Sequence, residues 1–263
     1  MTMRIGLLAG RTLSEHNLRV LQPILEDKDF EVALVIVDGR PAKSARGKVV
    51  DHIRRGRGGY TLIMTLQKWL RKPAHGMEVE EFCRVHRIAR LEIASPYSPE
   101  ASVQIREHNL GLLVLVSGFG IIRGPLLDIC PKGILSYHHG DMRKYRGMPP
   151  GLWELYNGET EIGITVQKLV AGLDCGIPIE EKHIPIYPND ALGTLTARLK
   201  AADEGMLYAA LKKMADPDFT PVPLQEFGKV YTLPNLRQWI ILNARITCRR
   251  LLCRLFPHLA ENP

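Results

Sequence analysis

Two adjacent histidines end an apolar run near the middle of the chain. The segment GILSYHHGDMRKYRG, residues 133–147, turns polar at His138 and His139 and continues with basic and aromatic side chains. Histidine titrates near neutrality, so it can give or take a proton in a reaction. Neighbouring residues of a strand point to opposite faces of a sheet, which argues against one metal ion shared by both imidazoles. With no CxxC pair and no HExxH motif in the chain, acid–base chemistry is favoured over a metal site.

An isolated acid, Asp174 in the segment AGLDCG, is a candidate partner for one of these histidines. A carboxylate beside an imidazole fixes its tautomer and raises its pKa. Aspartate close to glycine is also ordinary turn chemistry, so a plain turn is the alternative interpretation of Asp174. The corresponding alternative for each histidine is a hydrogen-bonded side chain at a strand end, without a chemical role.

The elements around these residues alternate between strands and helices. Apolar runs at RIGLLAG, FEVALVIVDG, GLLVLVSGFG, GILSYHH and IGITVQKL predict buried strands. Helices are predicted between them, one beginning at Ser98-Pro99-Glu100, and another running without a break over residues 190–215. This order predicts an α/β fold with a Rossmann-like, mostly parallel sheet covered by helices on both faces. Ligands bind beyond the carboxyl ends of such strands, where SGFGII, SYHHGDMRKYRG and AGLDCG should converge.

Composition and charge narrow the class of partner. The chain has 263 residues, of which 45% are hydrophobic and 24% charged, and its formal net charge is +7. Such a charge suits a phosphate-bearing partner, whether a nucleotide, a nucleic acid or an anionic lipid surface. Five scattered cysteines and the lack of a signal peptide or membrane span predict a reduced, cytoplasmic protein.

We expect the catalytic domain to span residues 1–215. Two segments of the chain are notably basic, one inserted within that domain and one following it. The insertion at about 40–75 carries ten Lys or Arg residues against the single acid Asp51. A solvated loop and an arm that meets phosphate groups are equally favoured there. The extension 216–263 ends in a basic helix around RITCRRLLCRLF. We expect this helix to dock onto the main domain or onto a second subunit, as in a homodimer, and membrane-surface binding is less favoured.

From Leu113 to Gly176 the chain resembles the catalytic domain of the folate-dependent formyltransferases. This family includes the methionyl-tRNA, glycinamide ribonucleotide and sugar-nucleotide N-formyltransferases. Its pattern is Asn-x-His, a loop that often reads Tyr-Arg-Gly, a helix, a Gly-x-Thr strand and an Asp-x-Gly turn. The sequence SYHHGDMRKYRGMPPGLWELYNGETEIGITVQKLVAGLDCG follows that pattern in register. The resemblance continues more weakly over the rest of residues 1–200.

The resemblance implies a role for each matching residue. His138 would be the catalytic histidine, and Asp174 the acid that orients it. The co-substrate would be 10-formyltetrahydrofolate, and the implied reaction is attack of an amine on its formyl carbon, with no metal. A protonated His138 would stabilise the oxyanion while Asp174 takes the proton of the amine. The folate would be held by Gly118, Phe119, Gly120, Ile121, Ile122 and Leu173, and the acceptor by Tyr145, Arg146 and Gly147.

Ser136 departs from the family pattern, which has asparagine at this position. A serine hydroxyl offers one hydrogen-bond donor where the amide offers two. Loss of one oxyanion donor costs about 3 to 4 kcal/mol, or roughly a thousandfold in rate. Either Ser136 acting through a water or His139 could supply the missing donor. A changed acyl donor or acceptor, and a lost catalytic function, are the other interpretations, and the retained His138 and Asp174 argue against the last.

The acceptor follows less directly from the sequence. The segment YRGMPPGLWELYNGE is similar to the tRNA and sugar-nucleotide branches, and little chain follows Ala215 for the β-rich domain of the tRNA enzymes. An amino-sugar nucleotide, a small amine with phosphate, is therefore the expected acceptor. Because GRPAKSARGK is similar to the loop with which tRNA enzymes enter the acceptor stem, a tRNA or lipid-linked acceptor is an alternative. Two alternatives to the transferase function itself remain. The protein could be a formyl-folate hydrolase, or a non-catalytic basic module that binds nucleic acid or membrane.

Overall fold

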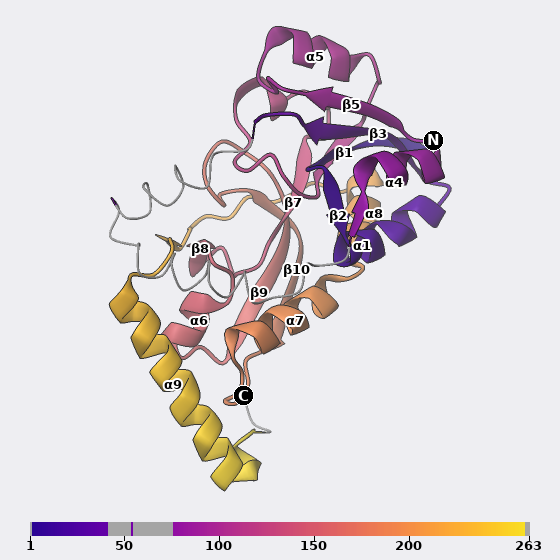
Figure 1. Ribbon diagram of the computed structural model, residues 1–263. Coiled ribbons are helices and arrows are strands. Elements are labelled where there is room, and N and C mark those ends of the chain that lie inside the picture. Colours follow the sequence, from indigo (N-terminus) through magenta and orange to yellow (C-terminus); the bar gives the residue numbers. More distant parts are fainter. Residues whose placement is uncertain (1, 42–53, 55–75, 261–263) are drawn as a thin grey trace.

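The computed structural model describes residues 2–41, 54 and 76–260 (Figure 1). The basic insertion predicted at about 40–75 therefore lies almost entirely outside the described residues, and both interpretations of it stay predictions.

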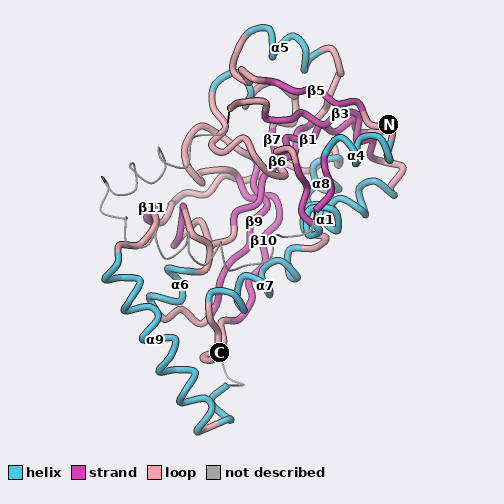
Figure 2. Tube along the Cα trace, in the orientation of Figure 1, coloured by secondary structure: helices cyan, strands magenta, loops and turns pink. Residues whose placement is uncertain are grey.

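A seven-stranded sheet forms the centre of the molecule, in the order β10-β9-β7-β6-β1-β3-β5. Figure 2 shows its strands running through the middle of the structure. The Rossmann-like, mostly parallel sheet predicted from the sequence is confirmed. The parallel strands are β1 (Met3–Ala9), β3 (Phe30–Asp38), β5 (Ala89–Ile93), β6 (Leu112–Leu115) and β7 (Ile134–His138), while β9 (Glu161–Lys168) runs antiparallel to β7 and β10 (Ile177–Pro185) antiparallel to β9.

Helices cover both faces of this sheet, as predicted. Helix α5 lies on one side, and α1, α4 and α8 lie on the other (Figure 1). The helices in the described part of the chain are α1 (Glu15–Glu26), α4 (Val79–His86), α5 (Pro99–Arg106), α6 (Leu152–Asn157), α7 (Leu192–Asp203), α8 (Met206–Ala215) and α9 (Leu236–Leu255), with short 3-10 turns η1 (Gly124–Leu126) and η2 (Pro257–Ala260).

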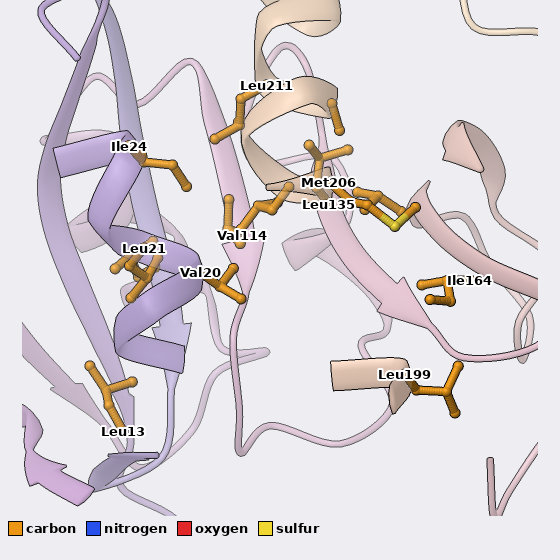
Figure 3. Close-up of a cluster of buried hydrophobic side chains, with 14 of the residues drawn as sticks. Leu13, Val20, Leu21, Ile24, Val114, Leu135, Ile164, Leu199, Met206 and Leu211 are labelled. Atoms are coloured by element: carbon orange, nitrogen blue, oxygen red, sulfur yellow. The ribbon is translucent and has the colours of Figure 1, made fainter. Parts of the chain in front are cut away.

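The two faces of the sheet carry separate hydrophobic clusters. Leu7 of β1 packs in the cluster under α1 and α8, part of which Figure 3 shows. Its neighbour Leu8 packs in the cluster under α5. Successive strand residues point to opposite faces, so a strand covered on both sides has to be apolar throughout. This requirement explains the unbroken apolar runs in the sequence.

The single helix predicted over residues 190–215 is wrong, because the chain forms α7 and α8 with a break between them. Gly205 adopts a φ of 87°, a left-handed conformation that most residues avoid. The break turns the chain so that Asp203, the last residue of α7, is completely buried. A glycine inside an amphipathic pattern is a weak stop signal, which is why the pattern alone suggested one continuous helix.

The C-terminal extension returns to the main fold by way of a short strand. In it, β11 (Lys229–Tyr231) pairs in parallel with β8 (Tyr145–Gly147), which is the Tyr-Arg-Gly segment. Another two-stranded ladder joins β2 (Thr12–Ser14) to β4 (Gly76–Glu78). The extension thus contributes backbone to the loop that follows His138.

Helix α9 docks onto the end of α6. Arg249 donates a hydrogen bond of 2.9 Å to the carbonyl oxygen of Leu155, and Arg245 donates to that of Tyr156. Both carbonyls lie in the last turn of α6, where such groups have no partner inside the helix. Cations at a helix C-terminus also interact favourably with its dipole. The basic extension therefore packs on the main part of the fold, in agreement with one of its expected roles.

Candidate active site

The end of β7 separates the two histidines onto opposite faces. Ser136 and His138 point to one face, and Tyr137 and His139 to the other, because side chains alternate along a strand. His138 is only 6% exposed.

Both ring nitrogens of His138 face an oxygen atom. Nε2 lies 2.9 Å from the carbonyl oxygen of Tyr145, and Nδ1 lies 3.7 Å from Oδ2 of Asp174. A carbonyl only accepts hydrogen bonds, so Nε2 carries the proton. In the neutral ring, Nδ1 then keeps a free lone pair on the side of Asp174.

Burial lowers the pKa of His138, because a desolvated imidazolium is costly, and this effect outweighs the opposing charge of Asp174. The ring is therefore neutral at neutral pH in the absence of substrate. This state differs from the protonated His138 expected from the resemblance, and its physical reason is the depth of the residue.

Asp174 is held in place by the Tyr-Arg-Gly segment. Its Oδ2 accepts a hydrogen bond of 2.7 Å from the backbone N–H of Gly147. Asp174 itself has a φ of 46°, so the turn is sharp at this residue. The side chain is 20% exposed and sits between solvent and His138. Two segments far apart in sequence therefore meet at His138, as the pairing of His138 with Asp174 predicts.

Arg146 joins the same region to the C-terminal extension. Its Nε donates to the carbonyl oxygen of Gly228 at 2.7 Å, and Nη1 lies 2.7 Å from Sγ of Cys175. The guanidinium also lies over the ring of Phe227, 5.5 Å from its centre. Arg146 thus bridges two segments of the protein, and its role toward an acceptor stays a prediction.

His139 is engaged with a carboxylate other than Asp174. Its Nε2 is 2.6 Å from Oδ2 of Asp203, and its ring stacks on Tyr137 with 5.7 Å between the ring centres. On the other side of Asp203, Nε2 of His16 lies 3.1 Å from Oδ1. Burial alone would raise the pKa of Asp203, but the hydrogen bond with His139 and the nearby imidazole of His16 outweigh it and lower that pKa. The suggestion that His139 supplies the missing oxyanion donor is therefore corrected: His139 lines the same small void as His138, but its Nε2 is already bound to Asp203.

Ser136 stays on the face of His138, half-buried. Its hydroxyl donates to the carbonyl oxygen of Tyr137 at 3.4 Å, a long hydrogen bond that leaves the group free to turn.

The predicted folate residues divide into two groups. Ile121, Ile122 and Leu173 line one cavity of about 390 Å³ together with Leu127. By contrast, Phe119 is 2% exposed and its side chain packs in the hydrophobic cluster under α5. Gly118 and Gly120 flank it with φ values of 70° and 64°, and they shape the loop. The segments around residues 121 and 173 are thus brought together as predicted, while Phe119 is structural.

Glu154 of α6 was not identified from the sequence. It is 3% exposed, and burial raises its pKa to about 7. With His138 and Gly147 it lines a void of about 10 Å³, enough for about one water molecule. The signal in the sequence was a charged residue among Leu152, Trp153 and Leu155, on a helix too short to show which face is buried.

Within the residues that the structure describes, no group of three or more His, Cys, Asp or Glu side chains is arranged to hold a metal ion.

Comparison with known proteins agrees with this arrangement. A family model described as formyl transferase matches residues 62–211, more than half of the chain. A methionyl-tRNA formyltransferase of Geobacter metallireducens is 37% identical over 121 residues, which cover 46% of this chain and 39% of that protein. One of Dictyoglomus turgidum is 30% identical over 151 residues, or 57% of this chain and 48% of that protein. The chain thus matches less than half the length of these two relatives.

Solved structures show the same fold at lower identity. Glycinamide ribonucleotide transformylase 1 from Symbiobacterium toebii superimposes with a TM-score of 0.59 at 20% identity, over 85% of this chain and 95% of that one. The sugar 3N-formyl transferase WlaRD, crystallised with dTDP and 5-N-formyl-THF, gives a TM-score of 0.56 at 14% identity, over 88% of this chain and 70% of that one. With the family model matching over more than half its length and the His138–Asp174 pair in place, the chain belongs to the folate-dependent formyl transferase family.

Proposed function

We propose that the protein transfers a formyl group from 10-formyltetrahydrofolate to an amine. The observation that carries this proposal is the pairing of the buried His138 with Asp174. Leu173, the residue before Asp174, lines the cavity of Ile121 and Ile122. A cavity of about 390 Å³ with several apolar side chains is within the usual size of small-molecule sites. Its residues fit a flat ring system such as a pterin, and bound folate would supply the formyl carbon as electrophile.

Proton transfer in this proposal begins from neutral His138. The Tyr145 carbonyl fixes the proton on Nε2, so the lone pair of Nδ1 can accept a proton from the attacking amine. The imidazolium that results lies beside the carboxylate of Asp174, which stabilises it and keeps its orientation. It can then offer the same proton to the negative charge on the formyl oxygen, or to the leaving nitrogen.

Ser136 is the proposed second donor to the formyl oxygen, through a water. Its side chain lies on the same face as His138 and is only loosely engaged.

For the acceptor we propose an amino-sugar nucleotide. The loop-helix segment YRGMPPGLWELYNGE and the formal net charge of +7 support an amine on a phosphate-bearing molecule. Methionyl-tRNA is the second candidate, because the two relatives described above, at 37% and 30% identity, are methionyl-tRNA formyltransferases.

Folate binding is the first test. Calorimetric titration with 5-formyltetrahydrofolate should give micromolar binding to the wild type and none to Ile121→Asp, which puts a charge into the cavity. Ile121 is 51% exposed, so this change leaves the core intact, and Val103→Asp on α5, 58% exposed, is the matched control. Equal binding by both variants, or no binding by well-folded wild type, would refute the folate proposal.

Transfer itself is tested by incubating the protein and 10-formyltetrahydrofolate with amino-sugar nucleotides or with charged tRNA, and weighing the products by mass spectrometry. A formylated acceptor that requires His138 supports the proposal and identifies the acceptor class. Formate release without any amine would instead assign a hydrolase.

A further inference from the structure

Helix α9 has two different faces. Leu242, Ile246 and Cys253 are buried against the rest of the protein. Successive residues of an α-helix are about 100° apart, which places these three on one side of the helix within about 40°. Figure 1 shows α9 along the outer edge of the molecule, with its last turns extending away from the central sheet.

The opposite side of α9 is an apolar stripe exposed to solvent. Ile240, Leu251 and Leu255 are 58%, 51% and 72% exposed. They fall within about 60° of one another and roughly opposite the buried side. Leu252 and Phe256 extend the exposed apolar surface at the end of the helix, at 48% and 50%. One such residue would be ordinary, whereas three on the same side of one helix, spread over about four turns, mark an interaction surface.

The arginines of α9 divide between its two sides. Arg245 and Arg249 are engaged with carbonyl groups of α6. Arg237, Arg250 and Arg254 form no ion pair within the residues that the structure describes, and all three are exposed. The helix contains no Asp or Glu. By the same rotation of 100° per residue, Arg237 and Arg254 lie within or beside the apolar stripe, whereas Arg250 lies closer to the buried side and lines a groove with α7.

A second copy of the chain is a poor match for this surface, because two arginine-bearing helices without acidic residues would repel each other. A lipid surface matches both the apolar and the basic side chains of this face. Acyl chains can bury the leucines, and anionic headgroups can pair with the arginines. No helix in the described part of the chain is long and apolar enough to cross a membrane.

We propose that α9 binds the surface of an anionic membrane, with Ile240, Leu251 and Leu255 in the headgroup–acyl boundary and Arg237 and Arg254 on lipid phosphates. This interaction is independent of the proposed reaction, because it needs neither His138 nor a folate.

The test is co-sedimentation of the full chain with phosphatidylcholine vesicles that contain or lack phosphatidylglycerol. The wild type should bind only the anionic vesicles, and less tightly as salt increases. Leu251→Gln with Leu255→Gln should lower the partition coefficient at least tenfold, because glutamine keeps helix propensity but cannot enter the acyl region. Arg237→Gln with Arg254→Gln should lower it by about fivefold for each arginine.

The matched control is Val85→Gln with Val103→Gln, two residues of α4 and α5 that are 56% and 58% exposed. Its binding should equal that of the wild type, and thermal melts should show that all variants stay folded. Wild type that does not sediment with anionic vesicles would overturn the proposal, as would binding that both α9 variants retain. A dimer in sedimentation equilibrium that the leucine variant dissociates would also overturn it and assign the stripe to a second copy.

Discussion

His138 is the residue whose environment determines most of the proposed chemistry. Its burial favours the neutral ring, and Asp174, 3.7 Å away, favours the charged one. The pKa of His138 is lowered overall, so the neutral base persists below the pH at which an ordinary histidine gains its proton. Activity that depends on this base should therefore rise with pH at values below the usual histidine range and then level off.

Replacing Asp174 by Asn should lower kcat by a factor of about 10² to 10⁴, since the imidazolium loses its stabilising charge. The same charge raises the pKa of His138, so its removal should move the acidic limb of the kcat profile to lower pH. The measurement is kcat against pH for both proteins. A limb that moves to higher pH, or does not move, contradicts the electrostatic role of Asp174.

Glu154 gives a stability prediction that needs no substrate. Its pKa is raised to about 7 in the folded protein, while an unfolded glutamate titrates near pH 4.3. The unfolded chain thus loses this proton first, and stability falls as the pH rises from about 4.5 to 7. Glu154→Gln should remove that dependence and be more stable than wild type at pH 8 by up to about 3 kcal/mol. Urea unfolding of both proteins from pH 4 to 8 measures the difference, and parallel curves would be the contrary result.

His139→Gln separates the two histidines. Because His139 pairs with buried Asp203 and not with the reacting groups, this variant should lose stability, by about 1 to 3 kcal/mol. It should keep kcat within about tenfold, whereas His138→Gln should lose at least a hundredfold. Equal losses of kcat in the two variants would show that His139 does take part in catalysis.

At the scale of elements, the sequence predicts those features that have a local signal. Alternation and apolar runs predicted the sheet, and Ser98 caps α5, accepting a hydrogen bond from the N–H of Ala101. The pairing of β8 with β11 has no such signal, because each strand has three residues and they lie far apart in the chain. The same reason hid the burial of Glu154, which depends on what packs over α6.

The pairing of β8 with β11 also restricts Gly147. Its φ is 93°, and a Cβ at this position would collide with the carbonyl oxygen of Tyr231. Gly147→Ala should therefore separate the strands and displace the N–H that holds Asp174. We expect a loss of more than about 2 kcal/mol in unfolding free energy, together with lower kcat.

Gly158→Ala is the matched control, since its φ of 80° is similar but nothing lies within 4 Å of the added Cβ. It should cost only the backbone strain, about 1 to 2 kcal/mol, and leave kcat unchanged. If the two variants lose the same stability and activity, the collision with Tyr231 is not the cause.

At the scale of the whole molecule, the chain after Ala215 is part of the site's framework. The carbonyl oxygen of Thr232 accepts a hydrogen bond from Trp153, and that of Gly228 accepts one from Arg146. Removing residues 228–263 would leave these donors without partners and expose the ring of Trp153. The truncated protein should melt several degrees lower than the full chain and lose most of its transfer activity. A truncated form with full activity would show that the extension serves another purpose.

The C-terminal extension packs back onto the main fold, and this predicts how the protein responds to proteolysis. Residues 216–228, which connect α8 to the returning strand, lie mostly exposed at the surface. The pieces on either side of them are joined by the β8–β11 ladder and by the arginine contacts between α9 and α6. A protease that nicks this connection would therefore leave two fragments still bound to each other, and the same pieces made separately should reassemble.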